Sequence, residues 1–167
     1  MFHFSAADLS ALANGAKEVT SLDISEQALA LARENGRLNK ASGAHITLAG
    51  DAFEVMKQLI HEQKRYEVVV IDPPSFAKRQ KEIVVAKKKY AQLAQLGEKL
   101  TARGGLLVLA SCSSRVSAKE FFTINKETLK QQPRHFSVQL STTHAIDHPV
   151  TFPEGAYLKC GYYRFQQ

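Results

Sequence analysis

The stretch VVVIDPPSFAKRQK, residues 68–81, decides which fold the sequence predicts. Its first four residues favour β-structure and predict a buried strand over residues 68–71. The strand should end at Asp72, because Pro73 and Pro74 cannot donate to a ladder and Pro73 also restricts the backbone of Asp72. The sequence therefore predicts a carboxylate at a strand end, with a rigid turn directly behind it.

Strand and helix patterns alternate on both sides of this stretch. Further strands are expected over residues 18–23, 45–49, 106–112, 136–140 and 156–165, and helices over residues 5–13, 52–62, 81–102 and 117–131 and after the capping Ser25. This alternation indicates βαβ units with right-handed crossovers and a mostly parallel sheet covered by helices on both faces. No helix separates the last two strands, which predicts an antiparallel hairpin. The expected fold class is α/β.

The pattern over residues 81–102 predicts the longest helix. Its inner face should carry four apolar residues spaced at threes and fours, Tyr90, Leu93, Leu96 and Leu100. The run Arg103-Gly104-Gly105 is expected to break this helix before the strand over residues 106–112.

The composition fits one soluble domain over residues 1–167, with 44% hydrophobic and 23% charged residues. No apolar run reaches the roughly 18 residues that cross a bilayer, and the first ten residues lack the features of a secretion signal. Cys112 and Cys160 form neither a disulfide framework nor a CxxC motif, and the six histidines are scattered. We therefore expect a cytoplasmic protein without a bound metal or a membrane segment.

The charge favours an anionic partner. The formal net charge is +6, and six cations crowd the residues after the Asp72 turn: Lys78, Arg79, Lys81, Lys87, Lys88 and Lys89. The cluster is consistent with an anionic partner such as a nucleic acid. A solvated helix face is an equally good interpretation of these residues alone.

Four predicted strand ends carry residues suited to chemistry, namely Asp23, Gly50-Asp51, Asp72-Pro73-Pro74 and Ser111-Cys112-Ser113. Ligands of open α/β sheets bind outside the carboxyl ends of the strands, so these residues are expected to line one site. Any one of the acids could instead be a helix cap or a surface carboxylate. Their recurrence at successive strand ends favours the site.

The first two acids suit a nucleoside-containing ligand. Asp23 can bind ribose hydroxyls, since a carboxylate accepts two hydrogen bonds. Asp51 can accept from an exocyclic amine, with Ala52 or Phe53 against an adenine face. Asp51 could also cap the helix that starts at Ala52, and both roles could hold together.

The turn after residue 71 suits a flat base with an amine edge. Asp72 offers an acceptor, Pro73 and Pro74 offer carbonyls without competing N–H groups, and Phe76 offers an aromatic plate. Phe76 could instead belong to the core.

Cys112 admits two interpretations. A cysteine at the end of an apolar strand is most often an inert, buried side chain. Its flanking serines and its expected place beside the Asp72 turn favour a reactive thiol, because a thiolate that adds to carbon 6 of a pyrimidine allows carbon 5 to attack a methyl donor. Cys160 has no such surroundings and is expected to be structural.

Taken together, these motifs resemble class I S-adenosylmethionine-dependent methyltransferases. Within them, the chain from about Leu9 onward resembles the bacterial 23S rRNA 5-methylcytosine methyltransferases. The resemblance rests on Asp23, Gly50-Asp51, residues 72–76, residues 111–113 and the C-terminal stretch DHPVTFPEGAYLKCGYYRF, residues 147–165. It implies a Rossmann-like sheet.

The resemblance also implies roles for single residues. S-adenosylmethionine would be bound by Asp23, Ile24, Asp51 and Ala52. Asp72 would orient the target cytosine, and Cys112 would be the nucleophile. The rRNA would contact Pro73, Pro74, Phe76, Lys78 and Arg79.

The start of the chain departs from this family. The family's catalytic domain begins with a strand and a glycine-rich loop, whereas residues 1–20 here resemble only the helix that follows. The resemblance therefore implies that the first strand and the loop are missing, which leaves a gap between the strands ending at Asp23 and Asp72.

Two other functions remain open from the sequence. One is methyl transfer to a base amine or ring nitrogen, with Cys112 in the core. The other is a non-catalytic RNA-binding remnant, folded as a homodimer. A nicotinamide dehydrogenase is disfavoured because its glycine fingerprint is absent from the sequence.

Overall fold

The computed structural model describes residues 6–38, 43–144, 155 and 157–166. The chain divides into two compact units, Met1–Val55 and Met56–Gln167, here called the N-terminal unit and the C-terminal unit. Each unit is described by itself, and the single domain expected from the sequence stays a prediction. The His-Pro-Val motif at residues 148–150 lies outside the described residues.

The described residues of the N-terminal unit form a pair of parallel strands and two helices, in the order α1 (Ala6–Ala13), β1 (Glu18–Asp23), α2 (Glu26–Leu38) and β2 (Ala44–Ala49). The strands pair from Glu18 opposite Ala44 to Asp23 opposite Ala49. Local chemistry sets the helix ends. Gly15 takes a φ of 92° just after α1, and the Ser25 hydroxyl accepts a 3.2 Å bond from the Ala28 amide at the start of α2.

The core of this unit is small. Its buried apolar side chains include Leu12, Leu29 and Ala32. The expected inner face of α2 is largely confirmed, although Ala28 and Asn35 are only half-buried and Gly36 is buried instead. Helix α3 (Ala52–His61) begins in the N-terminal unit and ends in the C-terminal unit.

The C-terminal unit contains a four-stranded sheet. Its elements are β3 (Tyr66–Ile71), the 3₁₀ turn η1 (Gln80–Glu82), α4 (Ile83–Leu100), β4 (Thr101–Ser111), α5 (Ala118–Lys130), β5 (Phe136–Thr142) and β6 (Lys159–Phe165). The strand order is β3-β4-β6-β5, with β3 parallel to β4 and with β6 antiparallel to both β4 and β5. The α/β class and the antiparallel C-terminal strands are confirmed.

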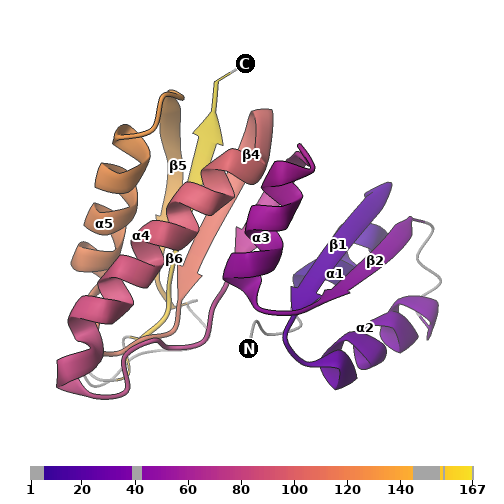
Figure 1. The fold of residues 1–167 in the computed structure, drawn as a ribbon, viewed down its shortest axis with the longest axis horizontal. Coiled ribbons are helices and arrows are strands. Elements are labelled where there is room, and N and C mark those ends of the chain that lie inside the picture. Colours follow the sequence, from indigo (N-terminus) through magenta and orange to yellow (C-terminus); the bar gives the residue numbers. More distant parts are fainter. Residues whose placement is uncertain (1–5, 39–42, 145–154, 156, 167) are drawn as a thin grey trace. The chain divides into compact units, whose positions relative to one another are not determined.

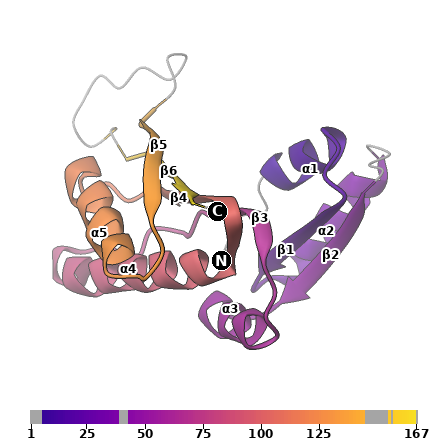
Figure 2. The ribbon, with the colours of Figure 1, turned by 90° about the horizontal axis from the view of Figure 1, so that it is seen from above.

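Both long helices of this unit, α4 and α5, pack against the same face of its sheet (Figures 1 and 2). The expectation of helices on both faces concerns the sheet of the whole chain, and it stays a prediction because the two units are described separately. The predicted inner face of α4 is confirmed, because all four of its residues are buried: Tyr90, Leu93, Leu96 and Leu100. They pack with other buried residues such as Phe121 and Leu107 in the core of the unit.

The prediction that residues 68–71 are buried throughout is wrong. Val69 and Ile71 are buried, whereas Val68 and Val70 are 57% and 48% exposed. Successive side chains of a strand point to opposite faces, and Ile71 lies on the face that packs against Gly97 of α4. One face of β3 therefore packs in the core while the other stays accessible.

The boundary between α4 and β4 also differs from the prediction. The helix ends at Leu100, and β4 already begins at Thr101, so it includes the Arg103-Gly104-Gly105 run. Gly104 takes a φ of 67°, and the β3–β4 register shifts between Tyr66 and Val68. The glycines produce an irregularity within a strand, because the left-handed backbone they permit interrupts regular pairing without ending it.

In the part of the chain that the structure describes, no helix is long and apolar enough to cross a membrane. Within the same residues, no group of three or more metal-binding side chains comes together.

Candidate active site

The N-terminal unit places two acids at neighbouring strand ends. Asp23 ends β1, and Gly50-Asp51 follows the end of β2. The Gly50 amide donates a 3.0 Å bond to the Asp23 carbonyl, so the two strand ends are joined by their backbone. The structure thus brings these two predicted cofactor-binding acids to one edge of the sheet.

The Asp23 carboxylate is 2% exposed and only half satisfied. Its Oδ1 accepts a 2.7 Å bond from the Ser25 amide, whereas its buried Oδ2 has no hydrogen-bond partner among the described residues. A buried carboxylate oxygen without a partner is costly, which makes Oδ2 a good acceptor for a ligand hydroxyl. The next residue, Ile24, is 58% exposed and can contact a ligand through its apolar surface.

Asp51 is exposed and caps a helix. Its Oδ1 accepts from the amides of Phe53 (3.0 Å) and Glu54 (3.2 Å) at the start of α3. The capping role considered from the sequence is therefore confirmed. Ala52 is 4% exposed, and Phe53 is half-buried.

The C-terminal unit joins the other two strand ends. Because β3 and β4 are parallel and pair up to Ile71 opposite Leu109, Asp72 and Cys112 both follow strands that end at the same edge. The Cys112 thiol donates to the Pro73 carbonyl, with 3.9 Å between sulfur and oxygen. Cys112 therefore lies against the Asp72 turn, as the sequence predicts.

The turn itself is well packed. Pro73 and Ala77 are buried, while Asp72, Pro74 and Ser75 are half-buried. The Ser75 hydroxyl donates a 3.2 Å bond to the Ala77 carbonyl, which closes the turn.

Phe76 is half-buried and already has two partners. Its ring lies 5.1 Å from the Tyr90 ring, at an interplanar angle of 60°, and the Lys89 ammonium lies 5.0 Å above it. The structure thus supports part of the alternative in which Phe76 belongs to the core. A base that stacks on the face beneath Lys89 has to displace this lysine.

Tyr90 links α4 to the end of β4. Its hydroxyl shares a 2.8 Å hydrogen bond with the Ser111 hydroxyl, which also accepts a 3.2 Å bond from the Ser113 amide. Burial raises the pKa of Tyr90, and negative charges on Cys112 and Asp72 raise it further. The neutral phenol is therefore favoured beside the thiol.

The six cations after the turn do not act alike. Lys87 bonds the Glu120 carboxylate at 2.6 Å, and Lys89 covers Phe76. Lys78 and Arg79 are exposed, and their backbone amides donate to the Glu82 carboxylate at 2.8 and 3.0 Å. The exposed side chains of Lys78 and Arg79 can therefore still contact an anion.

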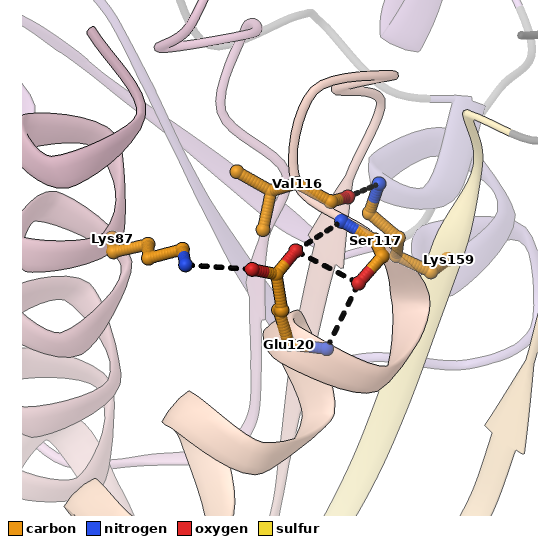
Figure 3. A network of polar contacts seen from close by, with 5 residues as sticks. All are labelled: Lys87, Val116, Ser117, Glu120 and Lys159. Atoms are coloured by element: carbon orange, nitrogen blue, oxygen red, sulfur yellow. Dashed lines mark hydrogen bonds and ion pairs between the residues drawn. The ribbon is translucent and has the colours of Figure 1, made fainter. Parts of the chain in front are cut away.

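The turn after Cys112 leads into a well-capped helix (Figure 3). The Ser117 hydroxyl accepts from the Glu120 amide at 3.3 Å and donates to the Glu120 carboxylate at 2.8 Å. The Ser117 amide also donates to this carboxylate, at 3.0 Å. Hydrogen bonds from Lys87 and Ser117 lower the pKa of Glu120 to about 2. The capping serine expected at the start of α5 is confirmed.

Sequence reasoning missed Lys159. This residue is 0% exposed, and its ammonium donates to the carbonyls of Ser113, Val116 and Tyr157. A signal was available in the pattern of β6, where Lys159 alternates in phase with three other buried residues, Gly161, Tyr163 and Phe165. A lysine in phase with the buried side of a strand indicates a satisfied internal ammonium.

A hollow of about 400 Å³ with basic walls lies where α5 ends and β5 begins. Its lining includes Lys126, Lys130 and Arg134. Arg134 donates to the carbonyls of Glu98, Thr101 and Ala102 at 2.7 to 2.8 Å, and Lys130 pairs with Glu127 at 2.9 Å. Two of its cations thus serve internal contacts.

Comparison with known proteins identifies the family. The model of the S-adenosylmethionine-dependent methyltransferase family matches residues 1–160. The chain belongs to this family. One methyltransferase relative, a ribosomal RNA large subunit methyltransferase of Deinococcus radiodurans, is 42% identical over 160 residues, which are 95% of this chain and 39% of the relative. Ribosomal RNA large subunit methyltransferase I of Aeromonas salmonicida is 32% identical over 89% of this chain and 38% of the relative.

Solved methyltransferases share the fold. A SAM-dependent methyltransferase of Streptococcus mutans superposes with a TM-score of 0.83 at 22% identity, over 98% of this chain and 43% of that one. A methyltransferase crystallised with SAH gives a TM-score of 0.80 at 23% identity, over 93% of this chain and 41% of that one. The chain spans about 40% of the length of the curated methyltransferases it matches.

Proposed function

We propose that this chain carries the catalytic residues of an S-adenosylmethionine-dependent RNA methyltransferase that modifies carbon 5 of a cytosine in large-subunit rRNA. The observation that carries the proposal is the thiol of Cys112 against the Pro73 carbonyl of the Asp72 turn, 3.9 Å from sulfur to oxygen. The names of the relatives support rRNA as the substrate.

The N-terminal unit fits the cofactor in its donor chemistry. The buried, unpartnered Oδ2 of Asp23 would accept a ribose hydroxyl. Asp51 would accept from the adenine amine through the oxygen that does not cap α3, while Ile24 and Ala52 would contact the ring. The bound cofactor supplies an electrophilic methyl group on sulfur.

Cys112 would act as the nucleophile. Its thiolate would add to carbon 6 of the cytosine, and the electron pair of the 5,6 double bond would let carbon 5 take the methyl group, while the electrons of the broken methyl–sulfur bond stay on the donor sulfur. A base not yet assigned removes the proton from carbon 5, and the electrons of that bond re-form the double bond and expel the thiolate. Asp72 would hold the ring nitrogen and amine of the cytosine during these steps.

The RNA would approach over the turn and the residues that follow it. Pro73, Pro74 and Phe76 would contact the target base, and the exposed Lys78 and Arg79 would contact phosphates. Replacing either of these two cations by a neutral side chain should weaken RNA binding and reduce its salt dependence.

The first test replaces the nucleophile. We expect Cys112→Ala to lower the formation of 5-methylcytosine in transcribed large-subunit rRNA at least ~100-fold, measured by mass spectrometry of the nucleosides, because the covalent route is lost. Cys160→Ala is the matched control and should retain activity.

The same variant, Cys112→Ala, distinguishes carbon 5 transfer from the second candidate function. The Asp72 turn with Phe76 suits transfer to a base amine or ring nitrogen, which needs no thiol. Methylated amine or ring nitrogen in the product, retained in Cys112→Ala, would replace the carbon 5 proposal.

The second test measures the cofactor site by calorimetric titration with SAH. Asp23→Ala should weaken binding at least ~10-fold because the ribose hydroxyl loses a charged, buried acceptor. Glu34→Ala, in an exposed pair with Arg37, is the control and should bind like the unmodified chain. RNA binding without SAH binding would contradict the proposal and support a non-catalytic RNA-binding protein.

Two expectations from the sequence stay predictions. A homodimer finds no support in the comparisons, and the proposed chemistry does not require one. The cytoplasmic location is likewise an expectation from cysteine usage.

A further inference from the structure

A lysine from a distant strand holds the turn that carries Cys112. Lys159 is 0% exposed, and its ammonium donates to the Ser113 carbonyl, to the Val116 carbonyl at 2.6 Å and to the Tyr157 carbonyl at 3.1 Å. An ammonium has three N–H donors, so these three carbonyls satisfy all of them. The buried charge is therefore fully hydrogen-bonded.

The pairing of β4 with β6 explains how Lys159 reaches this turn. Lys159 lies directly opposite Ser111, the last residue of β4. Cys112 thus stands between the residue that pairs with Lys159 and Ser113, whose carbonyl Lys159 holds. Tyr90 fixes the same strand end from the helix side through its 2.8 Å bond to Ser111.

The far end of the turn is anchored as well (Figure 3). Val116, whose carbonyl accepts from Lys159, directly precedes Ser117, the cap of α5. The Glu120 carboxylate that completes this cap is held by Lys87 of α4. Hydrogen bonds from Lys159 therefore hold the turn over residues 112–116 near its start, at Ser113, and at its end, at Val116.

Lys159 and Cys112 also interact through charge. Burial lowers the pKa of Lys159, whereas negative charges on Cys112 and Glu120 raise it. Lys159 thus supplies positive charge near the Cys112 thiol. On its other side, this thiol lies against the turn that carries the negative charge of Asp72.

We propose that Lys159 is a positioning residue for Cys112: it fixes the turn that presents the thiol to the Asp72 turn, and its charge favours anionic groups at the thiol. The inference rests on the proposed nucleophilic role of Cys112. Lys159 acts through this residue, because its own three donors are taken by backbone carbonyls.

The test compares two alkylating reagents on the whole chain with Cys160 replaced by Ala, so that Cys112 is the only cysteine. Iodoacetate is anionic and iodoacetamide is neutral, so the ratio of their rates reports the charge beside the thiol. We expect Lys159→Met to lower this ratio on the order of threefold, because one nearby positive charge is removed. A change in folding or accessibility alone affects both reagents and leaves the ratio unchanged.

Two variants complete the comparison. Lys159→Arg keeps the charge and should retain the ratio. Arg164→Met is the matched control, because Arg164 lies on the same strand and donates to the Gly104 carbonyl at 2.8 Å at the other end of β4. An unchanged ratio in Lys159→Met would overturn the proposal.

A second measurement covers the case in which Lys159→Met does not fold. The Nζ signal of Lys159 is followed by nuclear magnetic resonance as the pH rises, in the Cys160→Ala chain and in the same chain with Cys112→Ser. Because coupling between two charges is reciprocal, the titration of Lys159 should move to lower pH when the thiol is removed. An unchanged titration would contradict the proposed coupling.

Alkylation and titration need neither RNA nor cofactor. A chain that shows the Lys159 effect but transfers no methyl group therefore contradicts the proposed function and supports the positioning role.

Discussion

The two units hold their strand-end acids and thiol in different ways. In the N-terminal unit, Asp23 and Asp51 accept from backbone amides two or three residues further along the chain. In the C-terminal unit, the turn after Cys112 is held by Lys159, which is 43 to 46 residues away from two of the carbonyls it binds.

This difference shows how a site can combine local and distant support. A strand-end carboxylate that caps the next helix is oriented as soon as that helix forms. The Cys112 turn has its geometry only once β4 and β6 pair and Lys159 is buried. Substitutions in the two units should therefore differ in their effect on stability.

The largest effect is expected for Lys159→Met. Three backbone carbonyls lose their donor, and we expect the free energy of unfolding to fall by about 3 kcal/mol. Denaturant unfolding measures the change. In Arg164→Met, the exposed control, the fall should stay below about 1 kcal/mol. Equal losses in both variants would show that the buried position of Lys159 adds nothing, and a loss in Lys159→Met no larger than about 1 kcal/mol would remove the contrast with the local caps of the N-terminal unit.

A smaller effect is expected for Asp51→Ala in the N-terminal unit. The substitution removes the acceptor for two amides at the start of α3, and loss of such a cap costs about 1 kcal/mol. Asp51→Asn keeps a capping oxygen and should lose only a few tenths of a kcal/mol, again by denaturant unfolding. If Asn were as harmful as Ala, the carboxylate charge rather than the cap would be the important feature.

The smallest effect concerns the acid side of the pH range. The pKa of Glu120 falls to about 2 in the folded chain, below its ordinary 4.5, because Lys87 and Ser117 bond the carboxylate. Its contribution to stability is therefore full above pH 4.5 and is lost as the pH falls through 2. Because the Glu120 side chain is 42% exposed, solvent screening keeps this contribution small.

Glu120→Gln should flatten this acid dependence, followed as the denaturant midpoint between pH 5 and pH 2. Glu127→Gln, on the same helix and paired with Lys130, is the control. The same slope in Glu120→Gln and the unmodified chain would show that the cap carries none of the dependence.

Much of the fold could be predicted from the sequence, because it depends on contacts close in the chain. β1 has the bounds predicted for it, and the buried face of α4 and the serine cap of α5 follow from spacing and residue type alone. The same holds for the acids at the ends of β1, β2 and β3, since prolines, glycines and caps mark where each strand ends.

The tertiary structure decided the rest. Whether Val68 is buried depends on which face of β3 packs against α4, and the role of Lys159 depends on the register that sets it opposite Ser111. These contacts join residues far apart in the chain, and their burial and pairing exist only after the sheet has assembled. Local propensity carries no information on such contacts, so the sequence by itself determined the elements and their ends, and packing decided what supports Cys112.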